Sequence, residues 1–420
     1  MKNKRLVLWI VLPIIIAISA GAILWAVTSQ GITSLTMGEN GVTLYSSNAG
    51  TLRADRVYID GDGNACIDYT ATAKGEDSLI ANFNNVEING WAMAYRHHYT
   101  DTSGVSQGER TGTCVIAEAD ILERSGITDI YDVRFDLGTV IGMSDYDKKT
   151  VVLTVKDAPG QAPAARVPVE GEQVLVDTDE FTFIAQTAGL GTAFGYDEQH
   201  YVQFYMENKT DRTLYADLQV YAVNDLSLAI FNTVQLTPGA KACLPYGLDT
   251  SDYTRYGMST VDHIDFGLEV SDDDSNRVVE NTDFELYFNG YTADTLPEYP
   301  RNAEETETVI YDDDRFTFII FGAERFDDEM YMVHCYIENK TDEAITYSTE
   351  ESTINGITVK NDISGYGMSP YRKTYDHMVF RPEASGTDAA VEEFRFTLDV
   401  TTSSEGDVIV SPDRWFEYQP

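Results

Sequence analysis

Basic residues are scarce in this sequence. Lysine and arginine number 29 against 69 aspartates and glutamates, which gives a formal net charge of −40 at pH 7. Such a chain repels nucleic acids and anionic polymers unless basic residues gather locally. They gather only at the extreme N-terminus, at Lys2, Lys4 and Arg5. The composition therefore predicts no nucleic-acid partner and is typical of a solvated acidic surface.

Cysteine, histidine and the common catalytic motifs are also scarce or absent. The four cysteines form no C-x-x-C pair, although Cys66 and Cys114 could bridge within one domain in an oxidising environment. None of the six histidines has the spacing of a zinc motif. No G-x-S-x-G, H-E-x-x-H, phosphate-binding loop or dinucleotide-binding pattern occurs. The sequence therefore predicts a protein that is not an enzyme and that holds no cofactor, unless calcium binds.

A long apolar run follows the basic N-terminus. No residue from Leu6 to Val27 is charged, and as a helix this segment would be about 33 Å long, enough to cross a bilayer. Because basic flanks stay in the cytoplasm, the sequence predicts a single-pass membrane protein with residues 28–420 outside the cytoplasm. A cleaved signal peptide is the alternative, since Ala20-Gly21-Ala22 resembles a cleavage site.

Parts of the sequence repeat one another. The pentapeptide Glu-Asn-Lys-Thr-Asp occurs at residues 207–211 and again at 338–342. Val-Asn-Asp at 223–225 and Ile-Asn-Gly at 354–356 follow the two copies at the same spacing. A fainter third copy lies nearer the N-terminus, with Ile-Asn-Gly at 88–90. This agreement in order and spacing indicates a duplicated domain.

Short alternating segments fill each copy. They are rich in Tyr, Phe, Val, Ile and Thr and are separated by Asn-Gly, Asp-Gly and Pro-Gly turns, a pattern typical of an antiparallel sandwich. The sequence therefore predicts a mainly β protein, with three tandem immunoglobulin-like antiparallel β-sandwiches behind one N-terminal transmembrane helix. The predicted organisation is an anchor at 1–30, repeat 1 at 36–155, a proline-rich linker at 156–171, repeat 2 at 172–290, a linker at 291–306 and repeat 3 at 307–420.

One acidic turn in repeat 1 resembles a calcium-binding loop. Four oxygen-bearing side chains follow the spacing of such a loop's ligands: Asp60, Asp62, Asn64 and Asp68. The pattern then fails, because Ala65 replaces the required glycine and Ala71 the final glutamate. The flanking residues alternate as strands do, so a hairpin turn without a metal is the other interpretation.

The hairpin of an apolar strand, Glu-Asn-Lys-Thr-Asp, a second strand and then Ile-Asn-Gly or Val-Asn-Asp resembles a known kind of module. It is similar to tandem immunoglobulin-like modules of uncharacterised, membrane-anchored bacterial surface proteins. The resemblance covers residues 172–420 and, more loosely, 36–155. It implies no catalytic residues. The leading hypothesis is a non-enzymatic, membrane-anchored, extracytoplasmic interaction or envelope-associated protein, with an extracellular protein or glycan as its partner.

Two other functions stay open. The first is a glycan-binding or hydrolytic protein whose site lies in the divergent repeat 1, around His97, His98 and the loop 99–113. The second is a surface stalk that calcium stiffens through residues 60–68.

Overall fold

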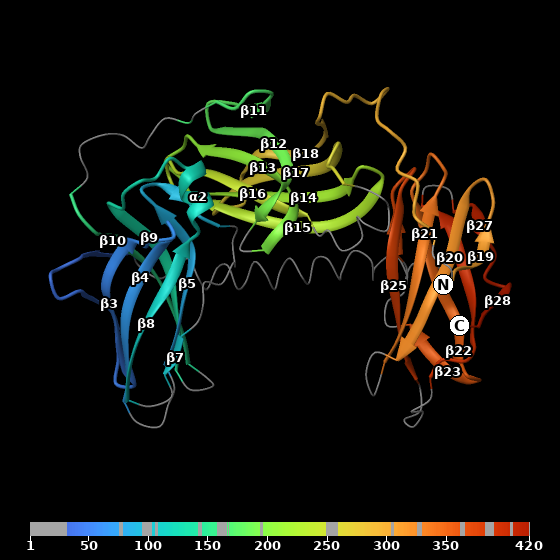
Figure 1. The fold of residues 1–420 in the computed structure, drawn as a ribbon, viewed down its shortest axis with the longest axis horizontal. Helices are drawn as coiled ribbons and strands as arrows, with labels where there is room; N and C mark the ends of the chain where they lie inside the picture. The colour runs from blue at the N-terminus through green and yellow to red at the C-terminus, as the bar shows by residue number, and fades with distance from the viewer. Residues whose placement is uncertain are drawn as a thin grey trace.

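In the computed structural model, β-strands make up nearly all of the regular structure (Figure 1). The structure describes residues 32–419 apart from 75–78, 95–102, 106–107, 142–144, 158–165, 167, 194–195, 249–258, 304–305, 326–329, 362–365, 383–389 and 404–405. These residues form sheets of 10, 14 and 4 strands, and the one helix among them is α2 (Ala119–Arg124). The prediction of a mainly β protein is confirmed.

We use the names repeat 1, 2 and 3 for the predicted segments 36–155, 172–290 and 307–420. The strands of repeat 1 lie in two sheets. The four-stranded sheet has the order β2 (Val42–Ser46), β3 (Gly50–Ile59), β4 (Ala65–Ala73) and β8 (Gly108–Ala117). The remaining strands join the 10-stranded sheet: β5 (Leu79–Ile88), β6 (Trp91–Ala92), β7 (Ser103–Val105), β9 (Asp132–Ile141) and β10 (Asp145–Thr154). Strand β1 (Thr33–Thr36), which ends where repeat 1 begins, lies in the same sheet.

Repeat 2 also contributes to two sheets. In the 10-stranded sheet lie β11 (Gln173–Asp177), β12 (Phe181–Ala193), β13 (Tyr196–Asn208) and β16 (Lys241–Leu248). In the 14-stranded sheet lie β14 (Leu214–Val223), β15 (Leu226–Leu236), β17 (His263–Asp272) and β18 (Arg277–Tyr287).

Repeat 3 completes the 14-stranded sheet. Its strands are β19 (Thr308–Asp312), β20 (Phe316–Arg325), β21 (Tyr331–Asn339), β22 (Ile345–Ile354), β23 (Ile357–Asn361), β24 (Tyr366–Met368), β25 (Lys373–Pro382), β26 (Phe394–Thr402), β27 (Val408–Val410) and β28 (Trp415–Tyr418).

Corresponding strands bury the same positions in all three repeats. Side chains of β4, β13 and β21 alternate between the core and the outside, as the period of a strand requires. The corresponding inward positions are all buried: Ile67, Tyr69, Ala71, Val202, Phe204, Met206, Val333, Cys335 and Ile337. Cys335 is fully buried where the other repeats have Tyr69 and Phe204, so this thiol acts as a small core side chain.

The sheets continue from one repeat into the next. Strand β6 of repeat 1 pairs in parallel with β16 of repeat 2, and β15 of repeat 2 pairs in parallel with β25 of repeat 3. One apolar core runs through repeats 1 and 2 and includes Phe321 and Tyr375 of repeat 3. Most of repeat 3 has a second core of its own. The repeats are therefore docked on one another, and Figure 1 shows them as an arch with repeat 2 at the top.

The predicted location as a single-pass membrane protein is corrected. Within the described part of the chain, no helix is both long and apolar enough to cross a bilayer. Helix α2 has 6 residues, whereas a spanning helix needs about 20. The apolar segment 6–27, which carried the prediction, lies outside the described residues.

The predicted option of a disulfide between Cys66 and Cys114 is not realised. All four cysteines are described, and they are buried thiols. Burial raises the pKa of Cys66 to about 11 and raises the pKa of Cys243 as well. Thiols held in the protonated form are poor nucleophiles and poor metal ligands, so packing accounts for them.

Candidate interaction surface

One asparagine closes an equivalent hairpin in each repeat. Asn224 donates its side-chain amide to Thr260 O (3.1 Å), and its Oδ1 accepts the backbone N–H groups of Asp262 and His263 (both 3.0 Å). Asn89 and Asn355 make the same set of bonds to the segments 129–132 and 390–393.

These asparagines occupy the left-handed region of backbone space. Their φ angles are 53° for Asn89, 52° for Asn224 and 51° for Asn355. Asparagine tolerates this conformation better than most residues. We call residues 89–91, 224–226 and 355–357 the docking turns. The docking turn of repeat 1 meets the start of β16, and that of repeat 2 meets the start of β25. We call β16, β25 and the corresponding strand of repeat 1, β8, the receiving strands.

The first junction joins the docking turn of repeat 1 to β16. Lys241 donates its backbone N–H to Gly90 O (2.9 Å), and Lys241 and Ala242 pair in parallel with Trp91 and Ala92. The Nζ of Lys241 lies 5.8 Å from the centre of the Trp91 ring, which packs edge-on against Tyr205. Trp91 is only 3% exposed, because repeat 2 covers it.

The second junction has the same construction. Lys373 donates its backbone N–H to Asp225 O (3.2 Å), and Leu226 pairs with Lys373. Its Nζ lies 3.2 Å from Asp225 Oδ2 and 2.5 Å from Tyr299 O. Leu226, in the place of Trp91, is 1% exposed. Lys241 and Lys373 are therefore equivalent first residues of receiving strands.

Each linker adds an arginine to its junction. Arg166 forms an ion pair with Glu172 and lies 5.2 Å from the centre of the Tyr205 ring. Arg301 in the second linker forms an ion pair with Glu307 and lies 4.9 Å from the ring of Tyr336. Such contacts between a guanidinium and an aromatic face stabilise partly desolvated surfaces.

Both tyrosines hold a glutamate beside the receiving strand. Tyr205 donates to Glu207 (2.7 Å) and Tyr336 to Glu338 (2.9 Å). Burial and the neighbouring carboxylates raise the pKa of both phenols, so both stay protonated donors. The Arg–Tyr–Glu arrangement thus recurs at each junction.

Buried polar contacts add specificity to each junction. The carboxylate of Glu87 accepts the N–H of Thr237 (3.2 Å) and its hydroxyl (2.8 Å), across repeats 1 and 2. Burial raises the pKa of Glu87. At the second junction Arg372 forms an ion pair with Asp265, and burial lowers the pKa of this arginine.

Among the described strands, none from another repeat pairs with the docking turn of repeat 3. Gly356, which corresponds to Gly90, is exposed, and Ile357, which corresponds to Trp91 and Leu226, is half-buried. The turn keeps its left-handed conformation, with φ of 76° at Gly356. Repeat 3 therefore retains the side of the junction that repeats 1 and 2 use.

Repeat 1 retains the other side of the junction in altered form. The pairing of Thr72 with Glu109 in β8 corresponds to that of Glu207 with Lys241 and of Glu338 with Lys373. Residues 108–111 at the start of β8 are exposed, and among the described strands none pairs with the outer edge of β8. Glu109 therefore stands at the exposed start of a receiving strand.

Two of the predicted calcium ligands, Asp60 and Asp68, belong to separate sets of hydrogen bonds. Asp60 Oδ1 accepts the N–H groups of Asp62 and Asn64 (both 2.9 Å), and these bonds close the hairpin turn. The carboxylate of Asp68 instead bonds to the side chains of Arg56, Tyr58 and Thr113. Within the described residues, no group of three or more histidine, cysteine or acidic side chains is placed to hold a metal.

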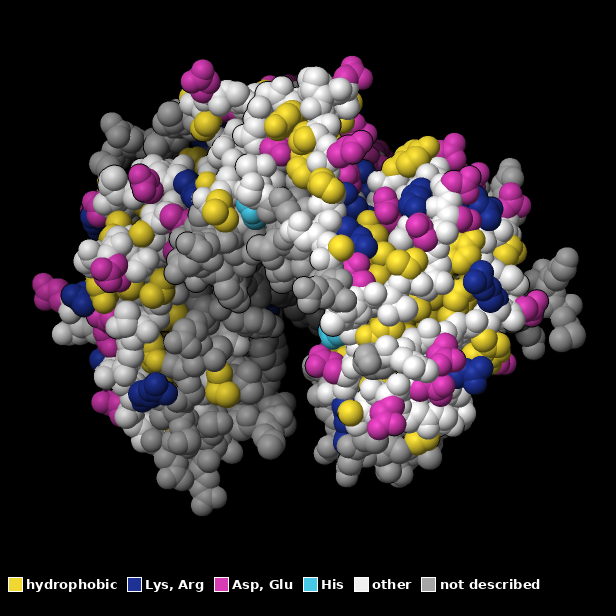
Figure 2. All heavy atoms as spheres, turned by 45° about the vertical axis from the view of Figure 1, so that its right-hand side comes forward, with side chains coloured by type: hydrophobic (Ala, Val, Ile, Leu, Met, Phe, Trp, Pro, Cys, Tyr) yellow, Lys and Arg dark blue, Asp and Glu magenta, His cyan; other side chains and the backbone are white. Residues whose placement is uncertain are grey.

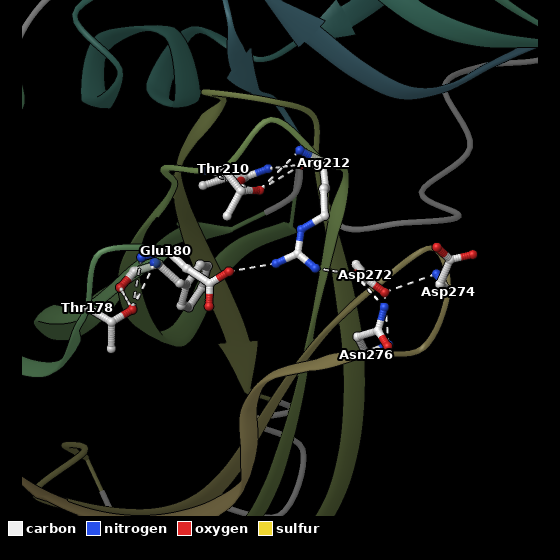
Figure 3. A network of polar contacts seen from close by, with 9 residues as sticks. Thr178, Glu180, Thr210, Arg212, Asp272, Asp274 and Asn276 are labelled. Atoms are coloured by element: carbon white, nitrogen blue, oxygen red, sulfur yellow. Dashed lines mark hydrogen bonds and ion pairs between the residues drawn. The ribbon is translucent and has the colours of Figure 1, made fainter.

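The same turn occurs a second time in the chain, in repeat 2. Asp272 Oδ1 accepts the N–H groups of Asp274 (3.0 Å) and Asn276 (2.8 Å), and Oδ2 accepts the amide of Asn276 (3.0 Å). In Figure 3 Arg212 lies between Glu180 and Asp272 and forms ion pairs with both. Hydrogen bonds within the turn lower the pKa values of Asp60 and Asp272, so both are ionised hairpin caps.

The repeated pentapeptide is part of the scaffold. Asn208 is fully buried and its amide donates to Arg212 O (2.7 Å), Leu236 O (3.0 Å) and Thr237 O (2.9 Å). Asn339 makes the corresponding bonds to the backbone oxygens of Glu343, Met368 and Ser369. Since the N–H groups of these amides are bonded to backbone oxygens inside the fold, they are not available to a ligand.

The remaining predicted site cannot be placed. His97, His98 and residues 99–102 and 106–107 of the loop around them lie outside the described residues. On the face in Figure 2, acidic side chains are spread over the surface with Lys and Arg between them. The junction residues were missed because their contacts join distant parts of the chain. The available signal was the repeated spacing of Arg166–Glu172 and Arg301–Glu307, in which a linker arginine precedes the first residue of a repeat by six positions.

No protein-family model matches the chain, and no curated protein matches it either. Among solved structures, Escherichia coli alpha-2-macroglobulin activated by porcine elastase is similar with a TM-score of 0.16 and 7% identity, over 88% of this chain and 32% of that one. The chain thus spans about a third of the length of the macroglobulin. Extracellular cadherin domains 3–6 of protocadherin gamma B2 give a TM-score of 0.13 and 8% identity, over 90% of this chain and 95% of that one. These values amount to a loose resemblance between β-rich structures and carry no functional argument.

Proposed function

We propose that this protein is a non-enzymatic interaction scaffold, in which three immunoglobulin-like β-sandwich repeats are held in a fixed order by one junction used twice. The observation that carries the proposal is the equivalence of Lys241 on Gly90 and Lys373 on Asp225. A docked array presents loops and strand edges at defined separations, which favours partners that contact more than one repeat. The partner that fits this arrangement best is a protein or glycan with several contact points.

The experiment measures the separation of repeats 1 and 3 by double electron–electron resonance. Spin labels go on two exposed positions, Thr111 in repeat 1 and Thr358 in repeat 3, each changed to cysteine. A narrow distance distribution that broadens in Lys373→Met supports a docked scaffold. A broad distribution in the parent chain would contradict it.

The enzymatic alternative needs its own assay. Purified protein is incubated with a panel of peptide and oligosaccharide substrates, and products are followed by mass spectrometry. Turnover that disappears in a His97→Ala, His98→Ala double variant would replace the scaffold with a hydrolase. Glycan binding without turnover would leave the scaffold in place and identify its partner.

A further inference from the structure

Every internal junction joins opposite ends of two repeats. In repeat 1 the docking turn ends β5, while β7 pairs with the beginning of β5 and leads into β8, so the docking turn and the start of the receiving strand lie at opposite ends. Repeat 2 uses both ends, because β16 receives repeat 1 and its own turn docks on β25. Within the described residues, no strand of another repeat pairs with the start of β8 in repeat 1 or with the docking turn at the opposite end of repeat 3.

We propose that copies of this chain associate head to tail, with the docking turn 355–357 of one copy on the start of β8 in the next. This inference rests on the proposed function in treating the junction as a docking interface. Both open ends lie at the lower ends of the arch, at β7 and β8 on one side and β22 and β23 on the other (Figure 1). A second copy is the occupant because it supplies the missing half of an interface that the chain already forms twice.

Backbone hydrogen bonding makes this contact possible despite sequence differences. In both internal junctions the N–H of the receiving strand's first residue donates to the carbonyl of the second residue of the turn. The equivalent groups are the N–H of Glu109 and the carbonyl of Gly356. Parallel pairing of this kind adds a strand edge to an exposed edge, and backbone groups supply most of the contact.

One pair of side chains at the open ends has opposite charges, as Asp265 and Arg372 have at the second junction. There, acidic Asp265 lies on the turn side and basic Arg372 on the strand side. When the hairpins are aligned on Asn224 and Asn355, Arg395 of repeat 3 occupies the position of Asp265. Glu109 provides the acidic group on β8. Thr70 stands in place of Tyr205 and Tyr336, so the stacked arginine has no counterpart. The association should therefore be weaker than the internal junctions and depend on concentration.

Two variants test the two ends separately. Glu109→Pro removes the backbone N–H that would donate from the outer edge of β8 to the next copy. Proline is tolerated on an edge strand where the N–H points away from the sheet. Val115→Pro is its control, since it lies six residues further along the same strand, with its N–H on the same side. Ile357→Asp places a charge on the apolar contact of the turn, and Thr358→Asp is the matched control at an exposed position.

Sedimentation equilibrium of the full chain gives the decisive measurement. The parent chain and both controls should rise above the monomer mass of 46.8 kDa as concentration increases, and each variant alone should stay monomeric. A mixture of Glu109→Pro with Ile357→Asp should form one-to-one dimers, since each has one intact end. Such rescue also shows that both variants fold.

Two results would overturn the proposal. One is a parent chain that stays monomeric at every concentration, and the other is association that neither variant weakens. Either leaves the proposed scaffold function untouched, because the internal junctions are tested by the spin-label distances. A heterologous contact of this kind forms rings or open filaments, so the mass of the largest species also reports whether the arch closes.

Discussion

Lys373 donates its backbone N–H to the carbonyl of Asp225 over 3.2 Å, and its Nζ lies 3.2 Å from the carboxylate of the same residue. Lys241 repeats the backbone bond to Gly90, but its Nζ lies over Trp91 and 3.8 Å from Glu207. The backbone contact is thus common to both junctions, while the side-chain contact differs. This difference separates their expected responses to mutation.

Lys373→Met should loosen the second junction more than Lys241→Met loosens the first. The Lys373 side chain is 11% exposed and bonds to Asp225 and Tyr299, so its loss should cost about 2 kcal/mol. Hydrogen exchange of peptides covering the start of β25 should then speed up by about 30-fold. Lys241→Met should cost about 1 kcal/mol or less, because it loses mainly a cation–aromatic contact. Equal effects at both junctions would show that the side-chain contacts do not matter.

Glu87→Gln should change the pH dependence of stability. Burial raises the pKa of Glu87 above its ordinary value of 4.5. As pH rises through 4.5, the unfolded chain releases this proton while the folded chain keeps it, so folding loses stability up to the folded-state pKa. The melting temperature of the variant relative to the parent should therefore increase between pH 4 and pH 8, as followed by circular dichroism.

Asp177→Asn provides a comparison of opposite sign. The ion pair with Lys209 and a hydrogen bond from Thr182 lower the pKa of Asp177 below its ordinary 3.8. Its contribution to stability is present above pH 3.8 and is lost as pH falls through the folded-state pKa. The melting temperature of the variant relative to the parent should therefore decrease as pH rises. The same direction of change in both variants would contradict the assigned pKa shifts.

Asp60→Ala should destabilise repeat 1 to the same extent with and without calcium. The carboxylate closes its turn with two backbone hydrogen bonds, and Asp68 is held by Arg56, Tyr58 and Thr113. Melting temperatures are measured with calcium and with a chelator. Asp272→Ala, in the similar turn of repeat 2, is the control. A calcium-dependent rise that Asp62→Ala abolishes would establish a cation site at residues 60–68.

The sequence contains much of what each repeat needs. Alternation predicted β-strands, and it agrees with the buried side of β4, β13 and β21, because the period of a strand is fixed by the backbone alone. The pentapeptide indicated a shared scaffold, and Asn208 and Asn339 indeed make matching bonds. Local chemistry was enough in these cases, since a turn is determined by residues close in sequence.

The junctions depend on contacts that no local pattern records. The linker 156–171 reads as an extended connector because of its prolines, yet Arg166 within it lies over Tyr205. Likewise Trp91 follows a turn and Lys241 begins a strand. The local sequence around these two residues does not show that they pair across repeats 1 and 2. The spacing of residues 60–68 predicts a calcium site, but the spacing does not show that Asp68 bonds to Arg56.

The three hairpin asparagines should differ in their contribution to stability. All three make the same bonds, but Asn224 is fully buried at the second junction, while Asn355 stays partly exposed at the open end. After Asn355→Ala, water can replace the lost acceptor, so the cost should be about 1 kcal/mol. Asn224→Ala leaves the N–H groups of Asp262 and His263 without an acceptor inside the protein, which should cost about 3 kcal/mol.

Glycine variants separate the two causes of this loss. Asn224→Gly and Asn355→Gly keep the left-handed conformation accessible but lose the same hydrogen bonds. If buried hydrogen bonding dominates, Asn224→Gly should be nearly as unstable as Asn224→Ala in denaturant titrations. Recovery of most of the stability in Asn224→Gly would instead assign the role of this residue to backbone conformation. The docking turns would then be interchangeable with any glycine-containing hairpin, and the equivalence of the three repeats would rest on the backbone alone.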